Sequence, residues 1–249
     1  MPKRPAPGQV LTPGGWRPQS KVHRLEPGHA VSMAGGRLKI VHAESGRVIK
    51  ELGVVPKAPK NKKAPKSKGA KAEAVGLPMK PVAKPKGAHA PAPITDGWIV
   101  YSGWFNTSAN PISYFTTQWA VPPAPATDHD QTIFLFNGIE PDDGAFVLQP
   151  VLQWGSSAAG GGGYWSITNW YVGSDGTALY MPLIQVNTGD VLEGVMTLTG
   201  DNGSNHDYLS SFTGFPAADL VVTNSVELTW ANETLECYDV AEFSDYPDA

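Results

Sequence analysis

The stretch Ala145-Phe-Val-Leu-Gln-Pro-Val-Leu-Gln-Trp154 has the two-residue alternation of a β-strand. One side of this predicted strand is apolar throughout: Phe146, Leu148, Pro150, Leu152 and Trp154. The other side alternates valine with glutamine: Val147, Gln149, Val151 and Gln153. Apolar neighbours on both sides predict burial on both faces, so Gln149 must be either hydrogen-bonded or functional.

Similar runs surround this stretch and are separated by turn signals. They cover residues 114–121, 132–137, 164–172, 178–186, 191–199, 208–212, 220–230 and 234–241. Gly160–Gly163 is predicted to be a flexible loop between two of them. In the last run Glu236 lies among apolar neighbours, which predicts that it is at least half buried. Many short strands without a long 3.6-residue period predict an all-β sandwich or barrel.

Charge divides the chain into two parts. All 19 Lys and Arg lie in residues 1–86 with only four acids, a net charge of +15. Residues 87–249 carry the other 19 acids and no Lys or Arg, a net charge of −19. Acid would relieve the self-repulsion of this half, which suggests adaptation to low pH. A polybasic segment often binds nucleic acid or anionic lipid, but here the nearest polyanion is the chain's own second half.

Composition predicts four regions. Residues 1–15 are rich in proline and glycine and are expected to be disordered. Residues 16–55 contain two strand-like runs around Glu44-Ser-Gly46, which predict a hairpin. Residues 56–92 repeat lysine, proline and alanine and are expected to form an extended linker. Residues 94–249 would form the acidic β-sandwich.

Several kinds of chemistry find no support in the sequence. Cys237 is the only cysteine, so no intramolecular disulfide can form, and we interpret it as a core residue. There is no G-x-S-x-G motif, and His129 and His206 lack zinc-type spacing. We therefore expect no metal and no cofactor. No apolar run reaches membrane-spanning length, and the N-terminus lacks the apolar region of a secretory signal.

Six short segments follow one another in the acidic half: Trp119-Ala-Val-Pro122, Phe136-Asn-Gly-Ile-Glu-Pro141, Val147-Leu-Gln149, Asn169-Trp-Tyr171, Val186–Leu192 and Thr234-Leu-Glu236. In order and spacing they resemble motifs of the glutamic peptidases (eqolisins): W-x-V-P, W-V-G-I-D-G, I-L-Q-T-G, W-Y-E-W-Y, V-x-x-G-D-x-I and A-E-W. The resemblance runs from about Trp98 to Phe243. The neprosin-type peptidases, which use two glutamates, are more distantly similar.

The resemblance implies a lectin-like (concanavalin-like) sandwich of two antiparallel sheets that hydrolyses polypeptides in acid. It places the catalytic glutamine on Gln149 and the catalytic glutamate on Glu236. Gln153 and Glu233 are the alternatives if the motifs are aligned in a shifted register. The sequence departs from the family at Pro150-Val151, where a glycine is usual, at Asn169, where an acid is usual, and in having no disulfide. Four aromatic residues are candidate cleft walls, with core packing as the alternative: Trp154, Trp165, Trp170 and Tyr171.

The family also has a basic propeptide, which matches residues 1–92. This predicts a zymogen in which the basic segment binds the acidic domain at neutral pH, plugs its groove with the hairpin, and is released in acid. The expected partners are a polypeptide substrate and this pro-segment, without nucleic acid or membrane, in a monomer. Secretion is implied by the resemblance alone. The alternative function is a carbohydrate-binding lectin-like sandwich without catalysis.

Overall fold

The computed structural model describes residues 6–56 and 96–248. The predicted linker at 56–92 therefore lies outside the described residues from residue 57 onward. The described part contains seventeen β-strands and four 3-10 helices of three residues each, and it contains no α-helix. The prediction of an all-β fold is confirmed.

Eight strands form the first sheet. Its main path is β3 (Val22–Arg24), β12 (Ala178–Tyr180), β11 (Gly160–Gly173), β10 (Phe146–Ser157), β9 (Thr132–Glu140), β17 (Trp230–Tyr238) and β7 (Gly97–Phe105), and β13 (Ile184–Gln185) pairs with β11 beside this path. The predicted strand at 145–154 thus lies in β10 from Phe146 onward, near the middle of the sheet. All pairs are antiparallel except β3 with β12.

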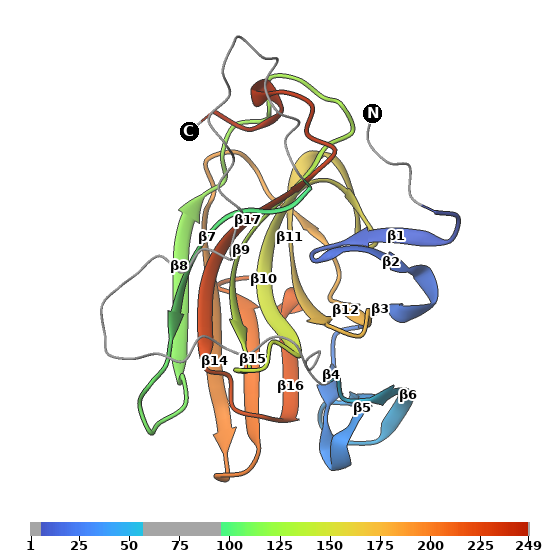
Figure 1. Cartoon of the computed structure of the whole chain (residues 1–249), viewed down its shortest axis with the longest axis vertical. Helices are drawn as coiled ribbons and strands as arrows, with labels where there is room; N and C mark the ends of the chain where they lie inside the picture. The colour runs from blue at the N-terminus through green and yellow to red at the C-terminus, as the bar shows by residue number, and fades with distance from the viewer. Residues whose placement is uncertain (1–5, 57–95, 249) are drawn as a thin grey trace, which may run out of the picture.

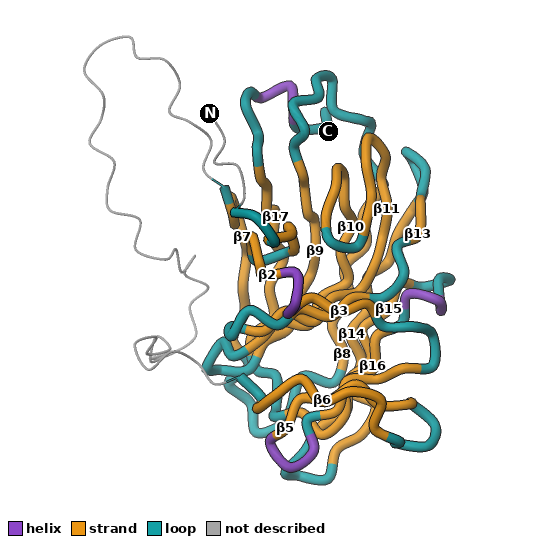
Figure 2. The backbone as a smooth tube through the Cα atoms, turned by 90° about the vertical axis from the view of Figure 1, so that its right-hand side faces the viewer, coloured by secondary structure: helices purple, strands orange, loops and turns teal. Residues whose placement is uncertain are grey.

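Seven strands form the second sheet. In order they are β6 (Val48–Val54), β5 (Arg37–His42), β4 (His29–Ser32), β16 (Leu220–Ser225), β15 (His206–Phe212), β14 (Val191–Asp201) and β8 (Tyr114–Ala120). The two sheets pack face to face as a sandwich (Figures 1 and 2). Leu148 and Tyr171 of the first sheet share a core cluster with Met196, Tyr208 and Val222 of the second.

The glycine run at 160–163 is not the flexible loop that the sequence predicted. Strand β11 begins at Gly160, which pairs with Ser157, while Gly161 and Gly162 pair with Ser156 and Gly155. The pairing requires glycine because a Cβ on Gly161 would lie 2.3 Å from the carbonyl oxygen of Gly155. The absence of a Cβ thus permits a close backbone approach here.

The prediction of disorder for residues 1–15 is wrong from Gln9 onward. Strand β1 (Gln9–Thr12) pairs with β2 (Gly15–Pro18) in a two-stranded hairpin, which we call the N-terminal hairpin. The turn between them is Thr12-Pro-Gly-Gly15, in which Gly14 has φ +83°. Proline followed by a glycine with positive φ is the preferred sequence of a type II turn, so composition alone misjudged this segment.

Residues 19–56 belong to the sandwich itself. Strand β4 pairs in parallel with β16, and the predicted hairpin around Glu44–Gly46 is present as β5 and β6, which extend the second sheet. Five apolar side chains of this segment lie in the main core: Leu25, Val31, Met33, Leu38 and Ile40. Packing in this core attaches this part of the basic segment, and the Lys21 ammonium group adds a hydrogen bond to the Asp175 carbonyl at 2.6 Å.

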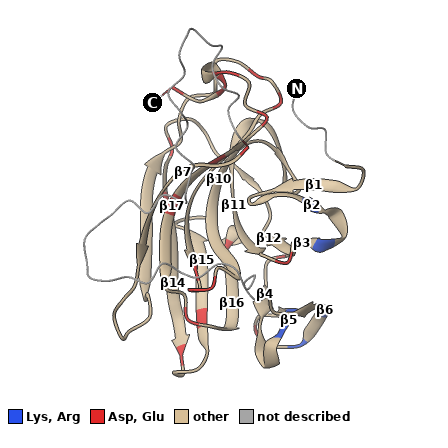
Figure 3. Ribbon diagram, in the orientation of Figure 1, with Lys and Arg blue, Asp and Glu red and all other residues tan. Residues whose placement is uncertain are grey.

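The ion pairs between described residues do not show the expected attraction between the basic segment and the acidic half. Arg24–Glu26, Arg37–Glu51 and Lys39–Glu51 lie within residues 6–56, and the two histidine–aspartate pairs lie within residues 96–248. No ion pair in these described ranges joins one to the other. Figure 3 shows the basic residues confined to the N-terminal strands and the acids spread over the remainder.

Candidate functional site

Glu236 lies on β17, on the outward face of the first sheet, and only 1% of its surface is exposed. Its Oε1 accepts hydrogen bonds from the Tyr238 hydroxyl and from the backbone N–H of Gly14, the latter at 2.8 Å. Its Oε2 has no hydrogen-bond partner of ordinary geometry among the described residues, although the side chain of Trp98, on the neighbouring strand, interacts with this carboxyl and lowers its pKa. Alternation along the strand places Tyr238 on the same face, while Gly14 comes from the turn of the N-terminal hairpin.

Burial dominates the electrostatics of Glu236 and raises the pKa of its carboxyl to about 7, although the bonds from Tyr238 and Gly14 and the charge of Arg17 pull this pKa down. A carboxyl that titrates near neutrality can both accept and donate a proton under mild conditions. A strongly shifted group in a site with few other charges is a candidate for acid–base chemistry.

The sheet register brings Gln153, not Gln149, level with Glu236. Gln153 on β10 pairs with Phe134 on β9, and Phe134 pairs with Glu236 on β17. Two strand spacings therefore separate Gln153 from Glu236, roughly 10 Å between Cα atoms. Gln149 lies four residues further along β10, which makes its Cα separation from Glu236 about 16 Å. The structure therefore does not bring together Gln149 and Glu236, the pair that the motif predicted.

The two glutamines differ in their hydrogen bonds as well. Gln153 is fully buried; its Nε2 donates to the carbonyl oxygens of Gly155 at 2.8 Å and Gly160 at 2.9 Å, and its Oε1 accepts from Ser157 at 2.8 Å. Gln149 is 1% exposed, and neither polar atom of its side chain has a partner among the described residues. Such an unpaired buried amide is costly.

The sequence did contain a signal for Gln153. The run Val151-Leu-Gln-Trp-Gly155 has glutamine two residues before glycine, as in the I-L-Q-T-G motif, whereas Gln149 is followed by Pro150-Val151. The alternative Glu233 points to the opposite face from Glu236, because the two are an odd number of residues apart. Of the residues that the motifs offered, Gln153 and Glu236 therefore lie level on one face of the sheet.

The N-terminal hairpin covers this face. The Ala158 N–H donates to the Leu11 carbonyl at 2.7 Å, and Arg17 Nη1 donates to the Gly173 carbonyl at 2.8 Å. Leu11 packs against Phe134, Val151 and Trp170, which lie on the outward face of the sheet. The hairpin that contacts Glu236 is therefore residues 9–18, whereas the β5–β6 hairpin lies at the edge of the second sheet (Figure 1).

The four predicted cleft aromatics are all buried. Tyr171 stacks on Phe146 between the sheets, and Trp165 packs edge-on against Trp154 in a second core cluster. Tyr171 and Trp165 point inward by strand alternation, so the prediction that these two residues wall a cleft is wrong. Trp170 faces outward beside Tyr180 beneath the N-terminal segment. Trp154 borders a hollow of about 320 Å³ that Leu11 and Trp16 of the hairpin also line.

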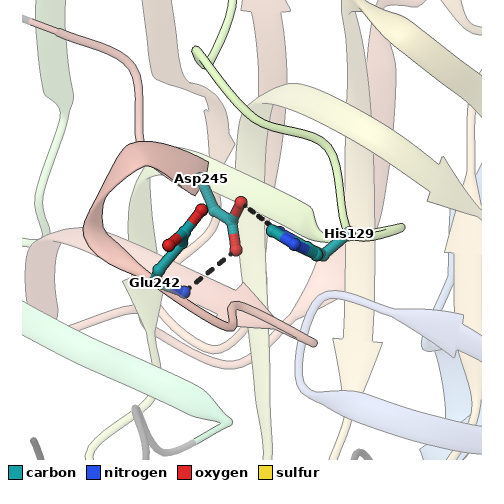
Figure 4. Close-up of side chains that lie close together, drawn as sticks. All are labelled: His129, Glu242 and Asp245. Atoms are coloured by element: carbon teal, nitrogen blue, oxygen red, sulfur yellow. Dashed lines mark hydrogen bonds and ion pairs between the residues drawn. The ribbon is translucent and has the colours of Figure 1, made fainter.

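His129, Glu242 and Asp245 form the one group among the described residues whose side-chain atoms lie close enough to hold a metal ion (Figure 4). Asp245 is fully engaged without one: it accepts from His129 Nδ1, Thr127 Oγ1 and the N–H groups of Ala241 and Glu242. Burial would raise the pKa of Asp245, but these bonds outweigh it and lower the pKa to about 2. The group fastens the C-terminal 3-10 helix η4 (Phe243–Asp245) to the 127–129 loop.

No protein-family model matches the chain, and a search of curated proteins gives no match either. Two crystal structures of Scytalido-glutamic peptidase, with a peptide-based transition state analog and with a transition state analog inhibitor, are similar at TM-scores of 0.37 and 0.38. Their sequences are 16% and 15% identical to this one, and the match covers 57% and 58% of this chain.

A third similar structure is SCP-B, a member of the Eqolisin family of peptidases, in complex with the tripeptide Ala-Ile-His. Its TM-score is 0.34, its identity is 16%, and the match covers 57% of this chain. The chain spans 63%, 66% and 62% of the lengths of these three structures. Separately, none of the described residues forms a helix that is long and apolar enough to span a membrane.

Proposed function

We propose that this chain is a glutamic-type peptidase in which Glu236 and Gln153 act on the same peptide bond. The observation that carries the proposal is the single row Gln153–Phe134–Glu236 on the outward face, with one buried carboxyl that titrates near neutrality. At roughly 10 Å between Cα atoms, the two side chains can reach opposite sides of one carbonyl group. From Gln149 the separation is too large for this.

In the proposed reaction the Glu236 carboxylate takes a proton from a water molecule, whose oxygen attacks the scissile carbonyl carbon. The Nε2 group of Gln153 donates a hydrogen bond to the oxyanion that forms, an effect typically of about 10² to 10³ in kcat. The protonated Glu236 then gives its proton to the leaving nitrogen as the C–N bond breaks. The carboxylate is regenerated, and one water molecule is consumed for each bond.

The described conformation corresponds in this proposal to an inhibited state. The Gly14 N–H occupies Glu236 Oε1 at the place of a leaving nitrogen. Both Nε2 hydrogens of Gln153 are directed to the Gly155 and Gly160 carbonyls, and Leu11 fastens Ala158 in the same β10–β11 connection. Displacing the N-terminal hairpin would uncover the carboxyl and let this connection release Gln153. The −19 charge of residues 87–249 favours work in acid, where self-repulsion falls.

The test is hydrolysis of a denatured protein in the presence of pepstatin and EDTA, using a Gly14→Ala background that disturbs the covering turn. Glu236→Gln and Gln153→Ala should each lower kcat by about 10² or more. Gln149→Ala is the matched control on the same strand face and should change kcat less than tenfold. Near-ultraviolet circular dichroism checks that each variant is folded.

If Gln149→Ala abolishes hydrolysis and Gln153→Ala leaves it intact, the pairing returns to Gln149. Complete loss with EDTA would point to a metal enzyme. Hydrolysis that survives Glu236→Gln would remove the basis of the proposal.

A further inference from the structure

A slot of about 400 Å³ opens between the free edges of the two sheets, where β7 of the first sheet faces β8 of the second. Two large aromatic side chains stand at this slot, Trp104 with 59% and Tyr114 with 56% of their surface exposed. Ile112 and Phe115 line it further in, against the main core. Exposed rings around a hollow are unusual on a soluble surface and often mark a binding site.

The slot lies on the opposite face of β17 from Glu236. Ser102 pairs with Glu233 and Trp104 pairs with Ala231, whose side chain is part of the core between the sheets. Glu233 therefore projects toward the second sheet, where the Thr117 hydroxyl of β8 donates to its Oε1 at 2.7 Å. This bond holds the carboxylate at the slot while the rest of the side chain stays exposed.

Among residues 6–56 and 96–248, no basic side chain lines this slot. Residues 96–248 contain no Lys or Arg at all, so no lysine or arginine from this part of the chain can neutralise Glu233, and the net charge of this part is −19. A carboxylate beside exposed indole and phenol rings matches the two ways in which proteins bind an ammonium or guanidinium group, the charged hydrogen bond and the cation–π contact. The negative field would also draw cations toward the slot.

We propose that this slot binds a lysine or arginine side chain of a basic polypeptide, with Glu233 accepting its hydrogen bond and Trp104 and Tyr114 covering its aliphatic stem. The site is separate from Glu236 and does not depend on the proposed peptidase activity. In a peptidase it would hold a basic segment of the substrate away from the reacting bond.

The test uses the full chain carrying Glu236→Gln, so that binding is measured whether or not the protein is a peptidase. The probes are blocked pentapeptides Ala-Ala-X-Ala-Ala in which X is lysine, norleucine or glutamate, titrated by calorimetry and by the indole NMR signal of Trp104. The lysine peptide should bind and should weaken as salt rises. Glu233→Gln and Trp104→Ala should each weaken it at least fivefold.

Glu193→Gln provides a matched control, because Glu193 is also held by threonine hydroxyls, those of Thr116 and Thr213, but does not line the slot. An equal loss in this control would mean diffuse attraction and overturn the site. Equal binding of the norleucine peptide would overturn the cationic assignment, and Glu233-dependent binding of a neutral hexasaccharide in place of lysine would favour a lectin.

If the chain's own lysines already fill the slot, the Trp104 signal should shift on adding 0.5 M salt and in Glu233→Gln. Absence of both peptide binding and this shift also overturns the proposal.

Discussion

Replacing Gly14 with alanine should open the N-terminal hairpin. Gly14 has φ +83°, and an added Cβ would lie 3.1 Å from Cγ1 of Val172 and 2.8 Å from Nη2 of Arg17. The left-handed backbone and the crowding together cost on the order of 1–3 kcal/mol. Because this cost falls on the closed state, the population of the open state should rise about 5- to 150-fold.

Opening has a defined consequence for Glu236. Its pKa is about 7 when covered and should fall toward the ordinary value of 4.5 when exposed. Because the closed state binds this proton more tightly, its contribution to closure is fully present below about pH 4.5 and is lost as pH rises through 7. The shift corresponds to roughly 3 kcal/mol at most. Local protonation thus favours closure in acid, contrary to the expectation that acid by itself releases the segment.

Hydrogen exchange of residues 9–16 at pH 6 measures the opening directly and should speed up by the same 5- to 150-fold. Peptidase activity should rise in parallel, and more at pH 5 than at pH 7, because the unaltered chain is more closed at pH 5. Gly28→Ala is the control, since Gly28 has φ +88° with no atom within 4 Å of the added Cβ. Unchanged exchange in Gly14→Ala, or equal acceleration in Gly28→Ala, would refute the reasoning.

Three further perturbations test other parts of the molecule. Tyr238→Phe removes a hydrogen bond that lowers the Glu236 pKa, so this pKa should move above 7, measured by NMR of ¹³C-labelled glutamate; a fall would contradict the assigned donor. Asp245→Asn should lower the urea midpoint at pH 6 and much less at pH 2. The stabilisation from a pKa lowered to about 2 is fully present above 3.8 and is lost as pH falls through 2. Gly161→Ala should lower Tm by several degrees, while Gly163→Ala, with open space around its Cβ, should change it little; similar values would argue against the close approach to Gly155.

Strand alternation predicted the sandwich because it is a local property of the sequence. Phe146, Leu148 and Leu152 face the core as their spacing requires, and the buried positions of Gln149 and Glu236 follow from their apolar neighbours. Alternation does not reveal which residues of different strands lie side by side across the sheet. The register that places Gln153, and not Gln149, beside Glu236 is set by pairings through β9, which no single strand encodes.

The N-terminal segment was harder to predict, for a physical reason. Its lysines and prolines suggested a segment bound to the acidic half by charge, but Leu25, Val31 and Leu38 are separated by short polar intervals and reach the core through the parallel pairing of this segment with β12 and β16. Such pairing across a long stretch of sequence leaves no turn signal. The Thr12–Gly15 turn was visible in the sequence, yet its contact with Glu236 depends on a residue 222 positions away.

These two parallel pairings also determine the order in which the protein can be assembled. Strands β3 and β4 need β12 and β16 as neighbours, so on a ribosome they leave the exit tunnel long before the partners that complete them have been made. Closing such long loops carries an entropic cost that is recovered only when the distant contacts form, which slows folding. The N-terminal segment, although synthesised first, is therefore expected to dock last, and a chain interrupted before residue 220 would leave the edge of β4 unpaired and open to association with other chains.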